Sequence, residues 1–111
     1  MRAYYHVTDP DEAREILREG FLPGWGDVGF GVYLWGSLTS ARRYAKKGGW
    51  DKKLGDPVIL MVGSPEIRPI HDHEVHPDWP NPEDYVDMFF WEGDEDNEEE
   101  LLVPEYMEVV E

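Results

Sequence analysis

The sequence contains no cysteine in its 111 residues, and this absence excludes several kinds of chemistry at once. Disulfide bonds, thiolate metal sites and cysteine nucleophiles are all ruled out. Long apolar runs are missing too, so the sequence predicts neither a membrane-spanning segment nor a secretory leader. With 41% hydrophobic and 14% aromatic residues, the chain can still form a packed core. These features predict a single cytoplasmic domain spanning residues 1–111.

Basic residues are almost missing from the second half of the chain. Residues 1–55 carry nine Lys/Arg against seven Asp/Glu, whereas residues 56–111 carry only Arg68 against eighteen acids. Binding of DNA or RNA depends on Lys and Arg side chains that neutralise phosphates, so a nucleic-acid partner is not expected. The preferred interpretation of the acidic charge is that it keeps the protein in solution. The alternative is that the acidic surface binds a basic partner.

Start and stop signals predict two helices in the N-terminal half. Asp9 is a good N-cap, Pro10 suits the first helical position, and Glu12 completes a capping-box pattern. Gly20 then provides a stop for this helix. Ser37 can cap a second helix that runs to about residue 47.

Short aromatic and β-branched runs predict strands, and clusters of glycine, proline or acids predict the segments between them. The strands are expected at residues 3–8, 32–35, 57–62, 86–91 and 106–110, with irregular segments at 21–31, 65–82 and 94–100. The resulting order, with helices early and strands late, is typical of an α/β or α+β domain.

Three side chains stand out as candidates for ligand binding. His6 lies at the end of the first predicted strand, where an imidazole can hydrogen-bond a ligand hydroxyl or carbonyl. Tyr33 and Tyr44 lie eleven residues apart, on a predicted strand and on the helix that follows it. Two such rings can form a slot for a flat heterocycle such as nicotinamide. The alternatives are a histidine that its own loop satisfies and two tyrosines that fill the core.

The order of motifs in residues 3–46 resembles that of a known superfamily. The segment reads YYHVT, then a helix with A-x-x-I-L-x-x-G-F, then G-x-G-V-Y-L-x-x-S-x-x-x-A-x-x-Y-A. This pattern is similar to the N-terminal half of ADP-ribosyltransferases with a His-Tyr-acid signature, and the final LVPEYMEVV resembles the closing strand of small members. The resemblance implies an α+β fold with a split β-sheet core and two short helices. It also implies NAD⁺ as the cofactor, cleavage of the nicotinamide–ribose bond, and transfer of ADP-ribose to a protein or small-molecule acceptor.

The resemblance also implies roles for individual residues around the nicotinamide and its ribose. His6 would hold the 2′-hydroxyl of the ribose, with Thr8 supporting the site. The backbone at Val7 would meet the carboxamide, although many relatives have glycine at that position. Tyr33 and Tyr44 would enclose the nicotinamide ring between them.

Further implied roles fall on two glycines, a serine and an acid. Gly29 and Gly31 would let the chain pass close to the cofactor, and Ser37 would hydrogen-bond the amide. The catalytic acid would grip the ribose and stabilise the positive charge that develops as nicotinamide leaves. Asp87 is slightly favoured for this role because a full predicted strand follows it, and Glu100 is the alternative because it fits a Glu-x-x-Val pattern. Each acid could instead be an ordinary solvated charge.

Other functions stay open at the level of sequence. The first is a non-catalytic module that binds NAD⁺ or ADP-ribose, or a protein-interaction domain on the same fold. An RNA 2′-phosphotransferase would need several basic residues to hold an RNA phosphate, and the second half has only one, so this function is not expected. A metal site is a further hypothesis, because residues 70–76 contain His71, His73 and His76 close to Asp72. A polar loop is the preferred interpretation of that segment.

Overall fold

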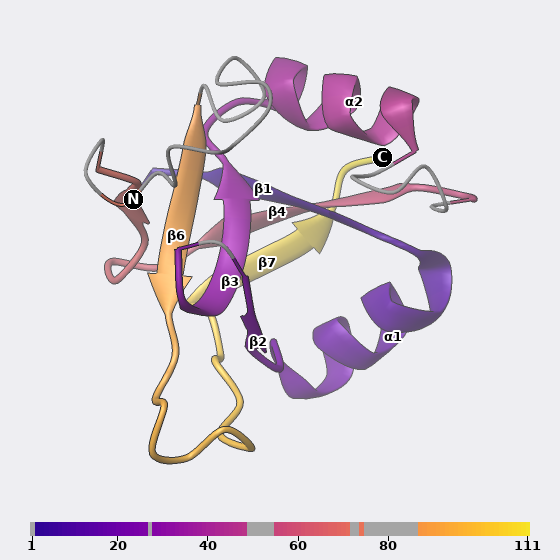
Figure 1. Ribbon diagram of the computed structural model, residues 1–111. Coiled ribbons are helices and arrows are strands. Elements are labelled where there is room, and N and C mark those ends of the chain that lie inside the picture. Colours follow the sequence, from indigo (N-terminus) through magenta and orange to yellow (C-terminus); the bar gives the residue numbers. More distant parts are fainter. Residues whose placement is uncertain (1, 27, 49–54, 72–73, 75–86) are drawn as a thin grey trace.

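The computed structural model describes residues 2–26, 28–48, 55–71, 74 and 87–111 of the chain. It is an α+β fold with two helices and a seven-stranded sheet, in agreement with the predicted class (Figure 1). Its elements are β1 (Tyr4–Thr8), α1 (Pro10–Glu19), β2 (Gly24–Trp25), β3 (Phe30–Trp35), α2 (Leu38–Lys47), β4 (Val58–Gly63), β5 (Arg68–Pro69), β6 (Met88–Glu92) and β7 (Tyr106–Val109). All strand pairings among the described residues are antiparallel.

The two helices begin and end at the residues that carry local signals. The Asp9 side chain accepts a hydrogen bond of 2.8 Å from the backbone N–H of Glu12, and Ser37 accepts one of 3.2 Å from that of Ser40. Gly48 ends α2 in the left-handed conformation, with φ of 81°, which glycine adopts at little cost. Both predicted N-caps are therefore confirmed. Neither helix in the described part of the chain is long and apolar enough to cross a membrane.

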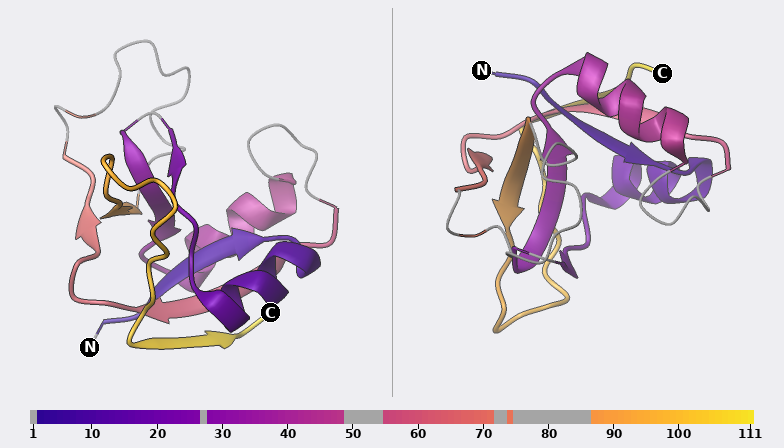
Figure 2. Two further views of the ribbon diagram at one scale, coloured as in Figure 1. Left: turned by 90° about the horizontal axis from the view of Figure 1, so that it is seen from below. Right: turned by 45° about the horizontal axis from the view of Figure 1, so that its top comes forward.

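The sheet has the strand order β5-β6-β3-β1-β4-β7, and β2 pairs with β3. Most neighbours pair over several residues, but β1 and β3 are in register at a single pair, Tyr5 opposite Trp35. Figures 1 and 2 show that β1 runs beside β4 and β7, whereas β3 and β6 lie at a steep angle to these strands. The two groups of strands thus separate between β1 and β3.

Alternate residues of the central strands supply two separate hydrophobic cores, because successive side chains in a strand point to opposite faces of the sheet. One core contains Val32 and Leu34 of β3 and packs against Ile16 of α1. The other contains Trp35 of β3 and packs against Ala41 of α2. Each helix therefore covers its own face of the sheet. A fully buried side chain such as Leu34, which is 0% exposed, contributes about 1.5–3 kcal/mol by burial.

Three of the predicted segments differ from the structure. The segment at residues 65–82 was expected to be irregular, yet it contains the short strand β5, which pairs with β6. The glycine-rich segment at residues 21–31 was expected to be irregular, yet it contains β2 and the first two residues of β3. The strand expected at residues 86–91 begins at Met88 instead, because Asp87 has φ of 68° and cannot continue an extended backbone. The acidic segment at residues 94–100 is exposed throughout, as expected.

Candidate functional site

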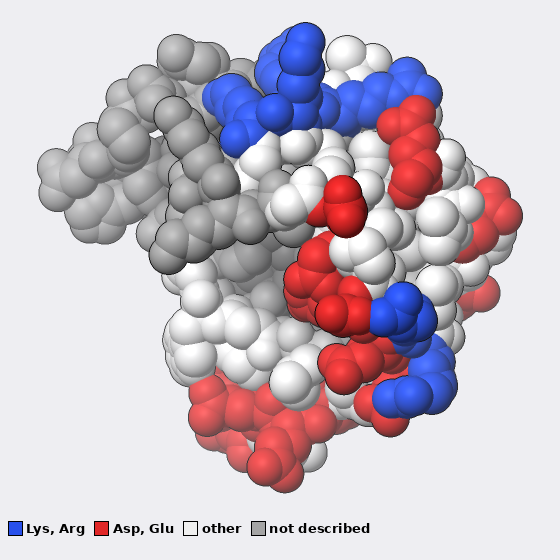
Figure 3. Space-filling view, turned by 90° about the vertical axis from the view of Figure 1, so that its right-hand side faces the viewer, with Lys and Arg blue, Asp and Glu red and all other residues white. Residues whose placement is uncertain are grey.

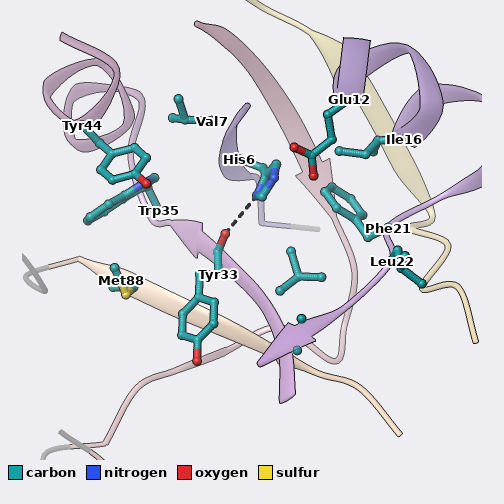
Figure 4. Close-up of a pocket in the computed structure, with 13 residues that line it drawn as sticks. His6, Val7, Glu12, Ile16, Phe21, Leu22, Tyr33, Trp35, Tyr44 and Met88 are labelled. Carbon is teal, nitrogen blue, oxygen red and sulfur yellow. Dashed lines mark hydrogen bonds between the residues drawn. The ribbon is translucent and has the colours of Figure 1, made fainter. Parts of the chain in front are cut away.

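A pocket of about 300 Å³ opens where β1 and β3 separate. Its walls come from both faces of the sheet, since Ile16 and Phe21 belong to the core beneath α1, and Trp35 and Met88 to the core beneath α2. Among the described residues, the lining is formed by His6, Val7, Glu12, Ile16, Phe21, Leu22, Gly24, Gly31, Val32, Tyr33, Trp35, Tyr44 and Met88 (Figure 4). Most of these lining residues are apolar or aromatic, and a few polar groups lie among them, as is usual for a small-molecule site.

His6 spans the gap between the two separating strands. Its Nδ1 atom lies 3.0 Å from the backbone carbonyl oxygen of Tyr33, and its ring meets that of Phe21 edge-on at 5.0 Å. A carbonyl oxygen can only accept, so Nδ1 carries the proton in this contact. Burial of the ring lowers the pKa of His6, and this effect outweighs the Tyr33 hydrogen bond and the charge of Glu12, which both raise it. His6 is therefore neutral near pH 7, and Nε2 is left as an acceptor.

Glu12 places a carboxylate in the same pocket. Its side chain extends from the first turn of α1, and the hydroxyl of Thr8 donates a hydrogen bond of 2.8 Å to Oε2. Figure 4 shows the carboxylate oxygens directed toward the His6 ring. The sequence interpretation used Glu12 only as a helix-start signal and missed its position at the pocket. The sequence signal that could have revealed this position is the four-residue spacing between Thr8 and Glu12. It places a hydroxyl just before the N-cap residue Asp9 and a carboxylate in the first helical turn after it.

Both candidate tyrosines line the pocket, but each ring also contacts another aromatic side chain. The Tyr33 ring lies 5.2 Å from that of Phe90, and the Tyr44 ring lies 5.3 Å from that of Trp35. The sequence interpretation did not identify Trp35 as a wall of the site. Since offset and tilted aromatic pairs hold one another in place, these contacts fix the two walls before any ligand binds.

The other residues proposed to bind the cofactor have varied positions. Val7 and Gly31 line the pocket, and a Cβ on Gly31 would lie 2.3 Å from the backbone oxygen of Trp91. Thr8 is buried next to the pocket and acts on it through Glu12. Gly29 lies in the turn before β3, where both its N–H and its carbonyl hydrogen-bond the Tyr33 hydroxyl.

Ser37 and Asp87 lie together at the start of α2, and neither lines the pocket. The Ser37 hydroxyl is used in the helix cap and donates to the hydroxyl of Ser40 at 3.1 Å. The Ser40 hydroxyl in turn donates a hydrogen bond of 2.9 Å to Oδ2 of Asp87. The backbone oxygen of Asp87 accepts a second one, of 2.8 Å, from the Gly36 N–H. Asp87 thus precedes β6, as the resemblance requires of the acid, but its carboxylate is bound to the α2 terminus.

Glu100 is exposed in the acidic connection between β6 and β7 and does not line the pocket. Two residues further on, Leu102 forms an isolated bridge with Phe21, which is a pocket residue. The chain near Glu100 therefore passes beside the site without placing that carboxylate in its wall.

The histidine-rich segment lies largely outside the described residues, which include His71 but not Asp72, His73 or His76. Glu74 is described, and its carboxylate binds the Arg68 guanidinium through contacts of 2.8 and 2.9 Å. This pairing lowers the pKa of Glu74 to about 2. Within the described ranges, no group of three or more His, Cys, Asp or Glu side chains is arranged to hold a metal ion.

Comparisons of the chain with protein-family models, curated proteins and solved structures found no match.

Proposed function

We propose that this protein binds NAD⁺ in the pocket between β1 and β3 and transfers ADP-ribose to an acceptor. The observation that supports this function best is the convergence of His6, Tyr33 and Tyr44 on one pocket. The sequence resemblance implies that these three residues contact the nicotinamide and its ribose. They come from β1, β3 and α2. Val7 and Gly31, which have implied roles in the same site, also line the pocket.

The size and lining of the pocket suit one end of the dinucleotide. A volume of about 300 Å³ is at the lower end of small-molecule sites, so the pocket would take the nicotinamide and its ribose while the adenosine extends outward. The aromatic walls of Tyr33, Trp35 and Tyr44 match a flat ring, because such rings attract one another when stacked or tilted.

The tautomer of His6 suits a role in holding the ribose. With Nδ1–H donated to the Tyr33 carbonyl, the Nε2 lone pair can accept a hydrogen bond from a ribose hydroxyl. The lowered pKa keeps Nε2 unprotonated at neutral pH. The backbone contact fixes the direction of the ring, so His6 would orient the ribose without being charged.

Glu12 is the carboxylate that we assign to the developing positive charge. In the reaction, the bond between the ribose C1′ and the nicotinamide nitrogen breaks, and its electron pair leaves with nicotinamide. An oxygen or nitrogen of the acceptor then bonds to C1′ and releases its proton. A carboxylate held beside the ribose lowers the energy of this cationic transition state. Glu12 lines the pocket and is held by Thr8, whereas Asp87 is bound to Ser40 outside the lining.

The test is to incubate the purified protein with NAD⁺ and measure free nicotinamide, beside the variants Glu12→Gln, Asp87→Asn and Glu100→Gln. Each variant removes one charge and keeps the shape and a hydrogen-bonding oxygen. We expect Glu12→Gln to lower the rate by about 100- to 1,000-fold, as removal of one electrostatic stabiliser does in other enzymes. Asp87→Asn and Glu100→Gln should stay within a few-fold of the wild type. A loss confined to either of them would transfer the catalytic role to that acid.

The positions of Asp87 and Glu100 favour a second candidate function, a module that binds NAD⁺ or ADP-ribose without turnover. Neither of the two acids suggested by the resemblance lines the pocket. This candidate predicts that NAD⁺ raises the melting temperature although no nicotinamide is released. An unchanged melting temperature together with no release would contradict both candidates.

A further inference from the structure

A group of apolar side chains is exposed to solvent beside the pocket. Its members are Leu22, Trp25, Leu101 and Val103, which we call the apolar patch. They are 65%, 62%, 39% and 70% exposed, respectively. Single exposed apolar residues are common on protein surfaces, but contiguous ones mark places where another molecule binds.

The backbone pairing between two distant segments places three of these side chains, those of Leu22, Leu101 and Val103, on one surface. Phe21 and Leu102 form an antiparallel bridge, and each donates an N–H to the carbonyl of the other at 2.8 Å. Phe21 is buried and Leu102 packs on the same core, so the residues next to them in the chain point outward. Leu22 and Leu101 are therefore neighbours on the outer side. Val103 lies there too, because its Cγ2 would be 3.1 Å from a Cβ on Gly20, the residue next to Phe21.

The apolar patch connects the pocket to the acidic connection after β6. At one end, Leu22 is also a lining residue of the pocket. At the other end, the Trp25 indole N–H donates to the carboxylate of Glu98. Glu98 belongs to the exposed segment 94–100, which has six acids in seven residues. Figure 3 shows acidic side chains gathered at the lower end of one face, next to uncharged surface, while the Lys and Arg side chains of α2 lie at the far end.

We propose that the apolar patch binds the ADP-ribose acceptor, and that this acceptor is a polypeptide segment with interspersed apolar and basic residues. Apolar side chains of the acceptor would cover Leu101 and Val103, and its Lys or Arg residues would face the acids of segment 94–100. An acidic or neutral segment gains nothing from these acids, and complementary charge both speeds encounter and excludes wrong partners. Since Leu22 borders both surfaces, a bound segment lies at the mouth of the pocket. The inference rests on the proposed function only in naming the partner as the acceptor.

The experiment measures binding of two synthetic peptides to the full chain by calorimetry. One peptide has leucines spaced among lysines, and the other has glutamates in place of the lysines. The test variant is Val103→Ser, and its matched control is Val109→Ser on β7, which removes a 50% exposed valine outside the patch. We expect the lysine peptide alone to bind, and Val103→Ser to weaken its binding by about tenfold while Val109→Ser has little effect. The double variant Glu95→Gln/Glu99→Gln should weaken it as well and reduce its dependence on salt.

Several outcomes would overturn the proposal. Equal loss of binding in Val103→Ser and Val109→Ser would show that the peptide does not use the patch, and binding of the glutamate peptide would remove the charge argument. A concentration-dependent dimer that Val103→Ser dissociates would make a second copy of the chain the occupant. Nicotinamide release by Val109→Ser should equal that of the wild type, because Val109 lies outside both the patch and the lining of the pocket. Peptide binding without any nicotinamide release would leave the patch in place and refute the proposed function alone.

Discussion

The hydroxyl of Tyr33 holds the turn between β2 and β3, and its removal gives a prediction that can be worked out in detail. It accepts hydrogen bonds from the backbone N–H groups of Val28 at 2.9 Å and Gly29 at 3.3 Å, and donates to the Gly29 carbonyl at 3.1 Å. The substitution Tyr33→Phe deletes all three contacts. It keeps the ring, with its contact to Phe90 and its place in the pocket wall.

The expected cost follows from the number and exposure of these hydrogen bonds. A typical intramolecular hydrogen bond contributes about 0.5–1.5 kcal/mol, and the 3.3 Å contact belongs at the weak end. The Gly29 carbonyl still accepts from the Gly26 N–H at 3.0 Å, so it does not lose every partner. The turn is at the surface, where water can replace the lost oxygen. We therefore expect Tyr33→Phe to lower the free energy of unfolding by about 1–2 kcal/mol.

Urea unfolding followed by intrinsic fluorescence measures this change, with Tyr4→Phe as the matched control. Tyr4 is buried, and its hydroxyl makes no hydrogen bond with any other residue in the described ranges, so its loss should change the stability by less than about 0.5 kcal/mol. Amide hydrogen exchange should become faster at Val28 and Gly29 in Tyr33→Phe. Nicotinamide release should stay within a few-fold of the wild type, because the stacking ring is retained. Equal stability of the two variants would refute the role of the hydroxyl.

Three further predictions test the cap, the strand and the histidine. Asp9→Ala should lower the free energy of unfolding by about 1 kcal/mol, because the N–H of Glu12 loses its acceptor. Thermal unfolding measures this loss, and Asp9→Asn should retain most of the wild-type stability because its side-chain oxygen can still accept. Gly31→Ala should cost about 1–3 kcal/mol or prevent folding, since its Cβ would lie 2.3 Å from the Trp91 oxygen, and a fully stable variant would contradict that geometry. The lowered pKa of His6 means that the unfolded chain binds more protons than the folded one below about pH 6.5. The stability that His6 contributes is therefore present above about pH 6.5 and is lost as the pH falls below that value. The difference in urea midpoint between the wild type and His6→Asn should accordingly change with pH below about 6.5 and stay constant above it.

The helices and their caps could be predicted from the sequence because the information is local. Asp9 and Ser37 each bond to a backbone N–H three residues away, so the pattern of residues determines the contact. The start of β6 was predicted less well, because the positive φ of Asp87 accompanies a hydrogen bond to Gly36, which is distant in sequence. Strands β2 and β5 were missed because the two residues of each depend on pairing, with β3 and β6 respectively, rather than on their own pattern.

The candidate site shows the same division between local and long-range information. His6, Tyr33 and Tyr44 were singled out from the sequence, and they line one pocket. The contribution of Glu12 could not be inferred in this way. The sequence predicted that Glu12 lies in the first turn of a helix, but its position beside His6 depends on how α1 packs across the sheet. Likewise, the contact of Trp35 with Tyr44 is set by tertiary packing that no short pattern encodes.

The pocket interrupts the sheet between β1 and β3, so the stability of the protein would report directly on a molecule bound there. A molecule in that gap would touch the cores on both faces together and act as a removable cross-link between the two groups of strands. Any ligand that binds only the folded chain stabilises it by about 2.7 kcal/mol at 100 times its dissociation constant. In a chain of 111 residues, this corresponds to a rise of roughly ten degrees or more in the melting temperature. A library of nucleotides and dinucleotides can therefore be ranked by melting temperature alone, whether or not the bound molecule is turned over.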